Sequence, residues 1–269
     1  MDKAVVLARG LGTRMRREDQ ATVLDERQAE LAALGLKAMI PIGRPFLDYL
    51  LSALADAGYR KVCLVVAPDH ELIRRYYWED VRPQRFQISF AIQAEPRGTA
   101  DAVAAAEGFA GRDYFLVVNS DNYYPIEALK ALRETQGFAT ALFEQEAMLA
   151  ESNIAPERIR QFAVGIFNHD GCLKRILEKP SPEVLAELPR PLWLSMNCWR
   201  FGPAIFEACS KIGPSPRGEY EITDAVQYAI DYLGARFEVV KVRAGVLDLT
   251  QRTDIRAVAR ALEGIPVRL

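Results

Sequence analysis

The sequence predicts an α/β protein with a mixed, mainly parallel β-sheet flanked by helices and a small β-rich extension. First, short apolar, β-branched runs alternate with helix-like segments through the first half of the chain. Second, Val5, Val6 and Leu7 form a continuous apolar run, which is typical of a strand covered on both faces. Third, the alternation implies right-handed crossovers between parallel neighbours.

In the first half we expect strands at 3–8, 61–67, 87–93, 113–119 and 140–146, and helices at 22–36, 45–58, 71–78, 99–108 and 126–136. Leu24, Leu31 and Leu34 give the first helix an apolar face, and Gly35 marks its end. The helix at 99–108 is rich in alanine, and the strand at 113–119 has a Tyr-Phe-Leu-Val-Val core.

The second half predicts more β-structure. Strands at 162–167 and 173–179 flank a hairpin turn at His169-Asp170-Gly171. Further along we expect a strand at 191–201, helices at 203–211 and 221–233, a strand at 237–242 and a helix at 253–262. Because no repeat, low-complexity segment or linker interrupts the chain, we expect residues 1–269 to form a single domain.

Composition narrows the class of function. The 269 residues carry a net charge of −2 without a long basic run, which argues against nucleic-acid binding. The four cysteines lack C-x-x-C spacing, which favours buried thiols in a reducing compartment. No signal peptide is recognisable and no apolar run approaches the roughly 20 residues that span a bilayer, so we expect a soluble, cytoplasmic protein. Because only two histidines occur, any metal is expected to bind carboxylates.

The first strand runs into Gly10-Leu11-Gly12-Thr13-Arg14. Two glycines let the backbone approach a bulky ligand closely, and the amides of such a turn, together with Arg14, suit a polyphosphate. Met15 stands where a dinucleotide-binding fingerprint has its third glycine, and no P-loop string occurs. We therefore expect a nucleotide loop of another type; an ordinary turn with two glycines is the alternative.

Acidic residues follow two of the expected strands. Asp121 lies in Asn119-Ser120-Asp121-Asn122, directly after the strand at 113–119, and Asp248 follows Val246-Leu247. Since ligands of parallel sheets bind beyond the carboxyl ends of the strands, the two carboxylates are candidates for holding Mg²⁺ against phosphate oxygens. A simple turn at Asp121 and a helix N-cap at Asp248 are the alternatives.

The segment from Gln93 to Thr99 leads from a strand into a helix. Gln93 offers a donor and an acceptor, as a uracil or thymine edge requires. Gly98 permits close approach of a flat base, and Thr99 is a candidate cap of the helix that follows. A capped helix after a Pro-Gly turn, with no ligand, is the alternative interpretation.

Two lysines complete the candidate set. Lys37 lies among apolar residues between Gly35 and Ile42, and Lys179 follows Glu178 at the end of a strand. Together with Arg14 they provide cations for a nucleoside triphosphate and a phosphorylated acceptor. An isolated surface lysine is the alternative at either position.

The order of several short segments resembles that of sugar-1-phosphate nucleotidyltransferases. These segments are Gly10-x-Gly12-Thr13-Arg14-Met15, Lys37-x-Met39-x-Pro41, Gly98-Thr99-Ala100, Ser120-Asp121-Asn122, Glu178-Lys179-Pro180 and Asp248. The similarity is to short bacterial glucose-1-phosphate thymidylyl- and uridylyltransferases, and it runs from Lys3 to about Asp254. It implies a Rossmann-like, GT-A-like nucleotide-diphospho-sugar transferase fold with a nucleotide-binding half at 1–150. Residues 151–269 would form the sugar-phosphate-binding half.

The resemblance also implies roles for single residues. Arg14, Lys37 and Lys179 would be catalytic, and Asp121 and Asp248 would bind Mg²⁺. The nucleotide would be bound by Leu7, Gly10, Gly12, Thr13, Gln93, Gly98 and Thr99. The sugar phosphate would be bound by Asn122, Ala163, Glu178, Lys179 and Asn197. The substrates would be an NTP, with dTTP or UTP favoured by Gln93, and glucose 1-phosphate by default. The sequence does not decide whether the chain forms a homo-oligomer.

The chain departs from the family pattern in several places. Arg9 stands where alanine is usual, the span at 16–36 is long, and Ala163 and Asn197 stand in place of glycines. Three alternatives therefore stay open. They are the same chemistry with another acceptor or base (mannose or heptose phosphate with GTP, or a phospho-alcohol with CTP), a non-catalytic nucleotide-binding paralogue, and a Rossmann dehydrogenase.

Overall fold

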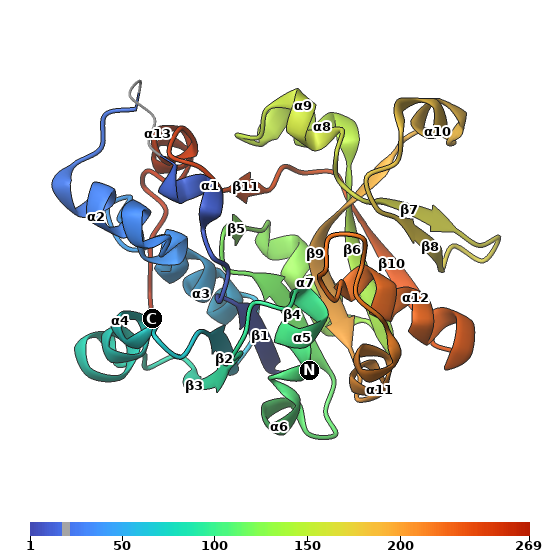
Figure 1. The fold of residues 1–269 in the computed structure, drawn as a ribbon, viewed down its shortest axis with the longest axis horizontal. Coiled ribbons are helices and arrows are strands. Elements are labelled where there is room, and N and C mark those ends of the chain that lie inside the picture. Colours follow the sequence, from blue (N-terminus) through green and yellow to red (C-terminus); the bar gives the residue numbers. More distant parts are fainter. Residues whose placement is uncertain (18–21) are drawn as a thin grey trace.

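Strand β1 (Lys3–Leu7) lies in the middle of the main sheet, parallel to β2 (Lys61–Val66) and to β4 (Phe115–Asn119). In the computed structural model, which describes residues 1–17 and 22–269, the strand order is β10-β6-β9-β4-β1-β2-β3 (Figure 1). The edge strands of this order are β3 (Gln87–Ile92) and β10 (Phe237–Val242), and β6 (Phe138–Glu144) lies beside β10. Strand β9 (Trp193–Phe201) runs antiparallel to β4 and β6, so the sheet is mixed and mainly parallel, which confirms the predicted fold class.

Two small β-elements complete the architecture. The hairpin of β7 (Val164–Phe167) and β8 (Leu173–Leu177) joins the main sheet where Val164 pairs with Leu194 of β9. This hairpin confirms the turn expected at residues 169–171. A separate two-stranded sheet pairs β5 (Asn122–Tyr123) with β11 (Leu247–Asp248), which brings residues more than a hundred positions apart side by side.

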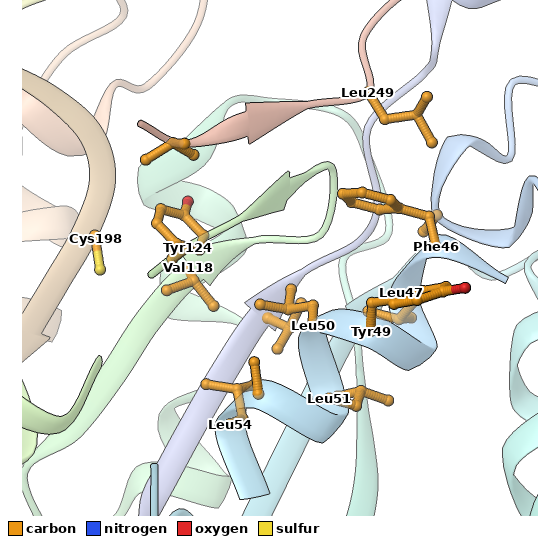
Figure 2. Packing of buried hydrophobic residues seen from close by; sticks show 14 of the residues in the cluster. Phe46, Leu47, Tyr49, Leu50, Leu51, Leu54, Val118, Tyr124, Cys198 and Leu249 are labelled. Atoms are coloured by element: carbon orange, nitrogen blue, oxygen red, sulfur yellow. The ribbon is translucent and has the colours of Figure 1, made fainter. Parts of the chain in front are cut away.

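Alternate residues of the central strands enter two hydrophobic cores, as the pleat of a doubly covered sheet requires. Val6 and Leu64 face the first core, whereas Val5 and Cys63 face the second. Helices α3 (Phe46–Asp56) and α7 (Ile126–Glu134) belong to the first core, in which Leu50 and Leu54 pack with Val118 (Figure 2). The second core is covered by α5 (Thr99–Ala104), α11 (Ala204–Lys211) and α12 (Ile222–Tyr232).

The helix expected at 22–36 is shorter in the structure. Helix α2 spans Glu26–Leu34 and starts at a capping box, in which the Asp25 carboxylate accepts from the Gln28 N–H and the Gln28 side chain accepts from the Asp25 N–H. Gly35 ends it in a left-handed conformation, as expected. The start of the long 16–36 segment includes residues 18–21, which lie outside the described part of the chain.

Three other expectations need correction. The helix expected at 99–108 is divided into α5 and α6 (Glu107–Ala110), and the one at 71–78 is α4 (Glu71–Arg75) followed by a π-helical segment, η2 (Tyr76–Val81). The strand expected to reach residue 146 ends at Glu144, because α8 (Gln145–Glu151) begins there. Beyond these, the described chain contains α1 (Thr13–Arg16), η1 (Lys37–Met39), α9 (Pro156–Ile159), α10 (Pro182–Glu187) and α13 (Asp254–Ala261). None of the described helices is long and apolar enough to cross a membrane.

Candidate active site

A cavity of about 390 Å³ opens where the parallel strands β1 to β4 reach their carboxyl ends. Its walls contain every residue expected to bind nucleotide, two of the three expected catalytic cations and one expected metal ligand. These are Leu7, Gly10, Gly12, Thr13, Gln93, Gly98, Thr99, Arg14, Lys37 and Asp121. The carboxyl edge of the sheet therefore gathers segments that lie far apart in the sequence, as the parallel topology predicts.

The two glycines of the loop after β1 have different surroundings. Gly12 has a φ of 61°, and a Cβ there would lie 2.4 Å from the carbonyl oxygen of Gly35. A Cβ on Gly10 would meet no atom within 4 Å. Gly12 is thus required by the fold itself, while Gly10 leaves open space at the cavity.

Long-range contacts hold this loop in place. The Arg16 guanidinium donates to the carbonyl of Leu34 at the end of α2 (2.9 Å), and Arg252 donates to the carbonyl of Met15 (3.0 Å). Arg14 lies between these anchors, exposed at the cavity wall and without an ion-pair partner among the described residues. Its guanidinium is therefore available for an anionic ligand.

Gln93, directly after β3, is buried, and hydrogen bonds donated by its side-chain amide fix its orientation. Its Nε2 donates to the carbonyl of Gly98 (3.1 Å) and to the Asp101 carboxylate (2.8 Å). With both amide hydrogens used in this way, Oε1 is the atom that Gln93 offers to a ligand, as an acceptor. Gly98 has a φ of 119°, and a Cβ there would lie 2.5 Å from the carbonyl oxygen of Tyr220.

Thr99 does not cap its own helix, contrary to expectation. It is already the first residue of α5, and its Oγ1 instead accepts from the N–H of Ile222 (2.8 Å), the first residue of α12. The N–H of Ala100 donates to the carbonyl of Tyr220 (2.9 Å). The turn that holds Gln93 and Gly98 is consequently fastened to the segment that begins α12.

The two expected metal ligands each have a cationic partner. Lys37 forms an ion pair with Asp121, and both line the cavity. Asp248 lies outside the cavity wall, in β11, where its Oδ1 accepts from Arg158 Nη2 at 2.6 Å. It does not cap a helix, so that alternative is wrong. Instead, Asp254, the first residue of α13, accepts from the N–H groups of Thr250 and Gln251, which precede the helix.

Electrostatics and hydrogen bonds connect the two carboxylates. Burial raises the pKa of Asp248, and the charge of Asp121 raises it further, while Arg158 acts in the opposite direction. The N–H of Leu249 donates to the Asp121 carbonyl (2.8 Å), which holds β11 beside that residue. Among the described residues, no group of three or more histidine, cysteine, aspartate or glutamate side chains is arranged to hold a metal ion. Two carboxylates do suffice for Mg²⁺, which typically completes its shell with substrate phosphates and water, so the donor set fits this ion.

The residues expected at the sugar phosphate are not part of the cavity wall. Lys179 and Glu178 are exposed at the end of β8, where Lys179 has a φ of 43° and Glu178 lies 3.7 Å from Arg217. Arg217 also pairs with Glu221 at 2.8 Å, and Glu219 between them lines the cavity. The segment at 217–221 thus lies between Glu178 and the cavity.

The other three members of this set have structural partners. Asn122 is buried, and its Nδ2 donates to Asp248 (3.2 Å). Ala163 is buried, and its carbonyl accepts from the Ser195 N–H (2.8 Å). Asn197 has a φ of 52°, a left-handed conformation that glycine and asparagine adopt most readily. That conformation explains why asparagine can stand where the family pattern has glycine.

Two residues with unpaired buried nitrogens also line the cavity. Arg9 Nε and His70 Nδ1 are buried without a hydrogen-bond partner among the described residues. The pKa of His70 is lowered by burial and by the charges of Arg9 and Arg74, against the opposing effects of Asp69 and a hydrogen bond to the Ala8 backbone. His70 was not among the expected site residues, although its position just after β2 is a usable signal in the sequence. No comparable feature of the sequence indicated that Arg158 would lie near the site.

The chain was compared with known proteins and structures. The sequence model of the nucleotidyl transferase family matches residues 26–262, which leaves the glycine-rich loop outside the matched range. UTP–glucose-1-phosphate uridylyltransferase AglF of Haloferax volcanii is 29% identical over 253 residues, covering 92% of this chain and 90% of that protein. Glucose-1-phosphate thymidylyltransferase of Streptomyces griseus is 32% identical over 230 residues, which are 85% of this chain and 57% of the relative. A solved structure of UDP-glucose pyrophosphorylase complexed with UDP-glucose superposes with a TM-score of 0.71 at 20% identity, covering 97% of this chain and 98% of the other, and shows the same fold.

Proposed function

The chain belongs to the nucleotidyl transferase family, and we propose that it transfers a nucleotidyl group from a nucleoside triphosphate to a sugar 1-phosphate. The observation that carries this proposal is the cavity at the carboxyl ends of the strands. There the glycine-rich loop, the unpaired Arg14 and the Lys37–Asp121 pair face one another. Such a combination of backbone amides and cations suits a triphosphate.

The reaction is an in-line displacement. An oxygen of the acceptor phosphate attacks the α-phosphorus, the bond from that phosphorus to the bridging oxygen of the β-phosphate breaks, and pyrophosphate leaves with the electron pair. The attacking oxygen is already ionised, so no general base is required. Arg14 and Lys37 neutralise charge on the departing pyrophosphate, and positioning supplies much of the remaining acceleration. Mg²⁺ bound by Asp121 and Asp248 would neutralise further phosphate charge.

The nucleoside is recognised at the β3 end of the cavity. Gln93 Oε1 is oriented as an acceptor by the two hydrogen bonds of its amide nitrogen, and the N3–H of uracil or thymine is a matching donor. The activities named for the two relatives, a uridylyltransferase and a thymidylyltransferase, support the same choice. We therefore propose UTP or dTTP as the nucleotide.

The acceptor binds toward β8, where Lys179 holds its phosphate and Glu178 its hydroxyl groups. Asn122, Ala163 and Asn197 shape the surrounding surface, and glucose 1-phosphate is the proposed default acceptor. Support comes from the segment at 217–221, which lies between Glu178 and the cavity and contacts both sides through Arg217 and Glu219. On this proposal, residues 1–150 and 151–269 contribute the two substrate sites of one domain.

The test is a pyrophosphate-release assay with Mg²⁺ that combines the five common nucleoside triphosphates with a panel of sugar 1-phosphates. We expect turnover with UTP or dTTP and glucose 1-phosphate. Turnover with GTP and mannose 1-phosphate, or with CTP and a phospho-alcohol, would keep the chemistry and change the substrates. Tight binding of a nucleoside triphosphate by calorimetry, with no pyrophosphate released from any pair, would contradict the proposal.

A further inference from the structure

Arg158 bridges two buried carboxylates that come from different elements. Its Nη2 donates to Asp248 in β11 at 2.6 Å, and its Nη1 lies 3.2 Å from Asp254 at the start of α13. The Asp248 and Asp254 side chains are 9% and 5% exposed, and Arg158 itself is 18% exposed. Since little water screens these groups, the charge of Arg158 acts on the two carboxylates more strongly than it would at an exposed site.

Asp248 does not need Arg158 to keep its position. The Asn153 side chain accepts from the Asp248 N–H and donates to its carbonyl, both at 2.8 Å. Asn122 donates to Oδ2 at 3.2 Å, and β11 pairs with β5 along the backbone. What Arg158 alone contributes is therefore a positive charge next to Asp248 Oδ1.

Asp254 likewise keeps partners of its own. Its Oδ2 accepts from the backbone N–H groups of Thr250 (3.0 Å) and Gln251 (2.9 Å). Loss of the Arg158 charge would leave this carboxylate hydrogen-bonded at the start of α13.

Both carboxylates of the proposed metal pair have a cationic side chain beside them in the absence of metal. Asp121 is paired with Lys37, and Asp248 shares Arg158 with Asp254, so each proposed metal ligand already has a cationic partner. A divalent cation that binds both carboxylates must share or displace these partners, and it is repelled by any cation that stays.

We propose that Arg158 acts as a built-in competitor of the divalent metal, occupying Asp248 Oδ1 and weakening metal binding until substrate phosphates add negative charge. This inference rests on the metal role assigned under the proposed function. Lys37 lines the cavity and Arg158 does not, so the effect of Arg158 is on the metal and not on direct contact with the nucleotide. Arg158 is accordingly a positioning residue for the metal site.

The test measures binding of Mn²⁺ alone to the full chain, by electron paramagnetic resonance of free Mn²⁺ without nucleotide. Arg158→Gln and Arg158→Met remove the charge, and we expect each to lower the Kd for Mn²⁺ about tenfold or more. Arg158→Lys keeps the charge and is expected to bind as the wild type does. Arg160→Gln changes an exposed arginine two positions away and serves as the matched control.

An unchanged or raised Kd in Arg158→Gln, with its fold intact by circular dichroism, would overturn the inference. Should Arg158→Met fail to fold, Arg158→Gln decides, because its amide can still donate to Asp254. The variant Asp248→Asn distinguishes a failure of the metal role of Asp248 from a failure of the competition by Arg158. If it leaves Mn²⁺ binding unchanged, or if neither the wild type nor Arg158→Gln binds Mn²⁺, the metal role in the proposed function fails and this inference fails with it. If it abolishes binding while Arg158→Gln has no effect, only the competition by Arg158 is refuted.

Discussion

Gly12 and Gly35 lie backbone against backbone: a Cβ on Gly12 would stand 2.4 Å from the carbonyl oxygen of Gly35, and one on Gly35 would stand 2.5 Å from that of Leu11. Both residues have positive φ angles, 61° and 74°. The loop after β1 and the end of α2 therefore meet at a distance that no side chain on either residue permits. The long segment before Lys37, which departs from the family pattern, is in this way part of the wall that shapes the loop.

Gly12→Ala is expected to destabilise the fold. The left-handed conformation alone costs alanine about 1–2 kcal/mol, and the contact with Gly35 adds to it, so we expect a total loss above about 2 kcal/mol. Urea denaturation measures the change. Gly10→Ala is the control, because its Cβ meets open space: its stability should equal that of the wild type, while turnover falls if the loop lies against the triphosphate. Equal stability of the two variants would contradict the packing argument.

Asp121→Ala tests the proposed chemistry. The residue is half-buried at the cavity and paired with Lys37, so its loss removes a metal ligand and frees a lysine that can still reach water. We expect pyrophosphate release to fall by at least about 10²-fold, with the melting temperature nearly unchanged. Full activity of the folded variant would refute the metal assignment. Asp113→Ala is a suitable control, because Asp113 is an exposed carboxylate that also pairs with a lysine, Lys3, but lies before the amino end of β4.

Arg9→Ala tests whether the unpaired arginine serves the nucleotide. Arg9 lines the cavity and has a buried Nε without a partner, an arrangement that stabilises the free protein little and favours an acceptor supplied by a ligand. A hydrogen bond to a charged group contributes about 1.5–3 kcal/mol, so affinity for the nucleoside triphosphate should fall about tenfold or more. Calorimetry measures the affinity, and thermal unfolding should show no loss of stability. Unchanged affinity would assign Arg9 no part in binding.

His70 gives the protein a specific pH dependence. Its pKa in the folded state is lowered, chiefly by burial, from an ordinary value of 6.5. As the pH falls through 6.5, His70 becomes protonated in the unfolded chain but stays neutral in the folded chain. The free energy of unfolding therefore decreases below this pH, and the contribution of His70 is fully present above it. His70→Gln should therefore lose less stability than the wild type between about pH 7.5 and about pH 5.5. Thermal unfolding at the two pH values gives the comparison, and equal losses would contradict it.

The four thiols should differ in reactivity. Burial raises the pKa of Cys63 to about 11 and that of Cys209 to about 12, and raises that of the fully buried Cys198 as well. Cys172 is half-buried, next to Arg236. Since the thiolate is the reacting species, a chromogenic disulfide reagent at about pH 8 should modify Cys172 rapidly and the other three only on unfolding. Cys172→Ser should abolish the fast phase; its persistence would show that a buried thiol is accessible.

The sequence predicts well what depends on local pattern and on parallel topology. Each strand of the main sheet lies within a few residues of its expected position, because its apolar run is short and bounded by polar turns. Gln93, Asp121 and the glycine-rich loop were expected to meet since parallel strands place their carboxyl ends at one edge. At α2 only the boundary shifts, because Asp25 and Gln28 set the start of the helix.

Contacts between distant segments could not be predicted in the same way. Thr99 carries a good capping side chain, but its partner at Ile222 is 123 positions away and is chosen by the packing of α12. Arg158 reaches Asp248 across 90 positions from a four-residue helix with no periodic signal. The π-helical turn at Tyr76–Val81 follows neither helical nor strand periodicity. In each case the tertiary arrangement decides what the local sequence leaves open.

The hydrogen bond from Arg252 to Met15 joins positions 237 residues apart, and the cavity wall runs from Leu7 to Thr250. A chain emerging from the ribosome can form its first parallel strands early, but the glycine-rich loop lacks its last anchor until the segment carrying Arg252 has left the exit tunnel. Nascent chains halted short of that point would be poor nucleotide binders. On the proposed function, nucleotide affinity would arise only once the segment carrying Arg252 has been made, and nucleotide would selectively stabilise chains that have been translated past it.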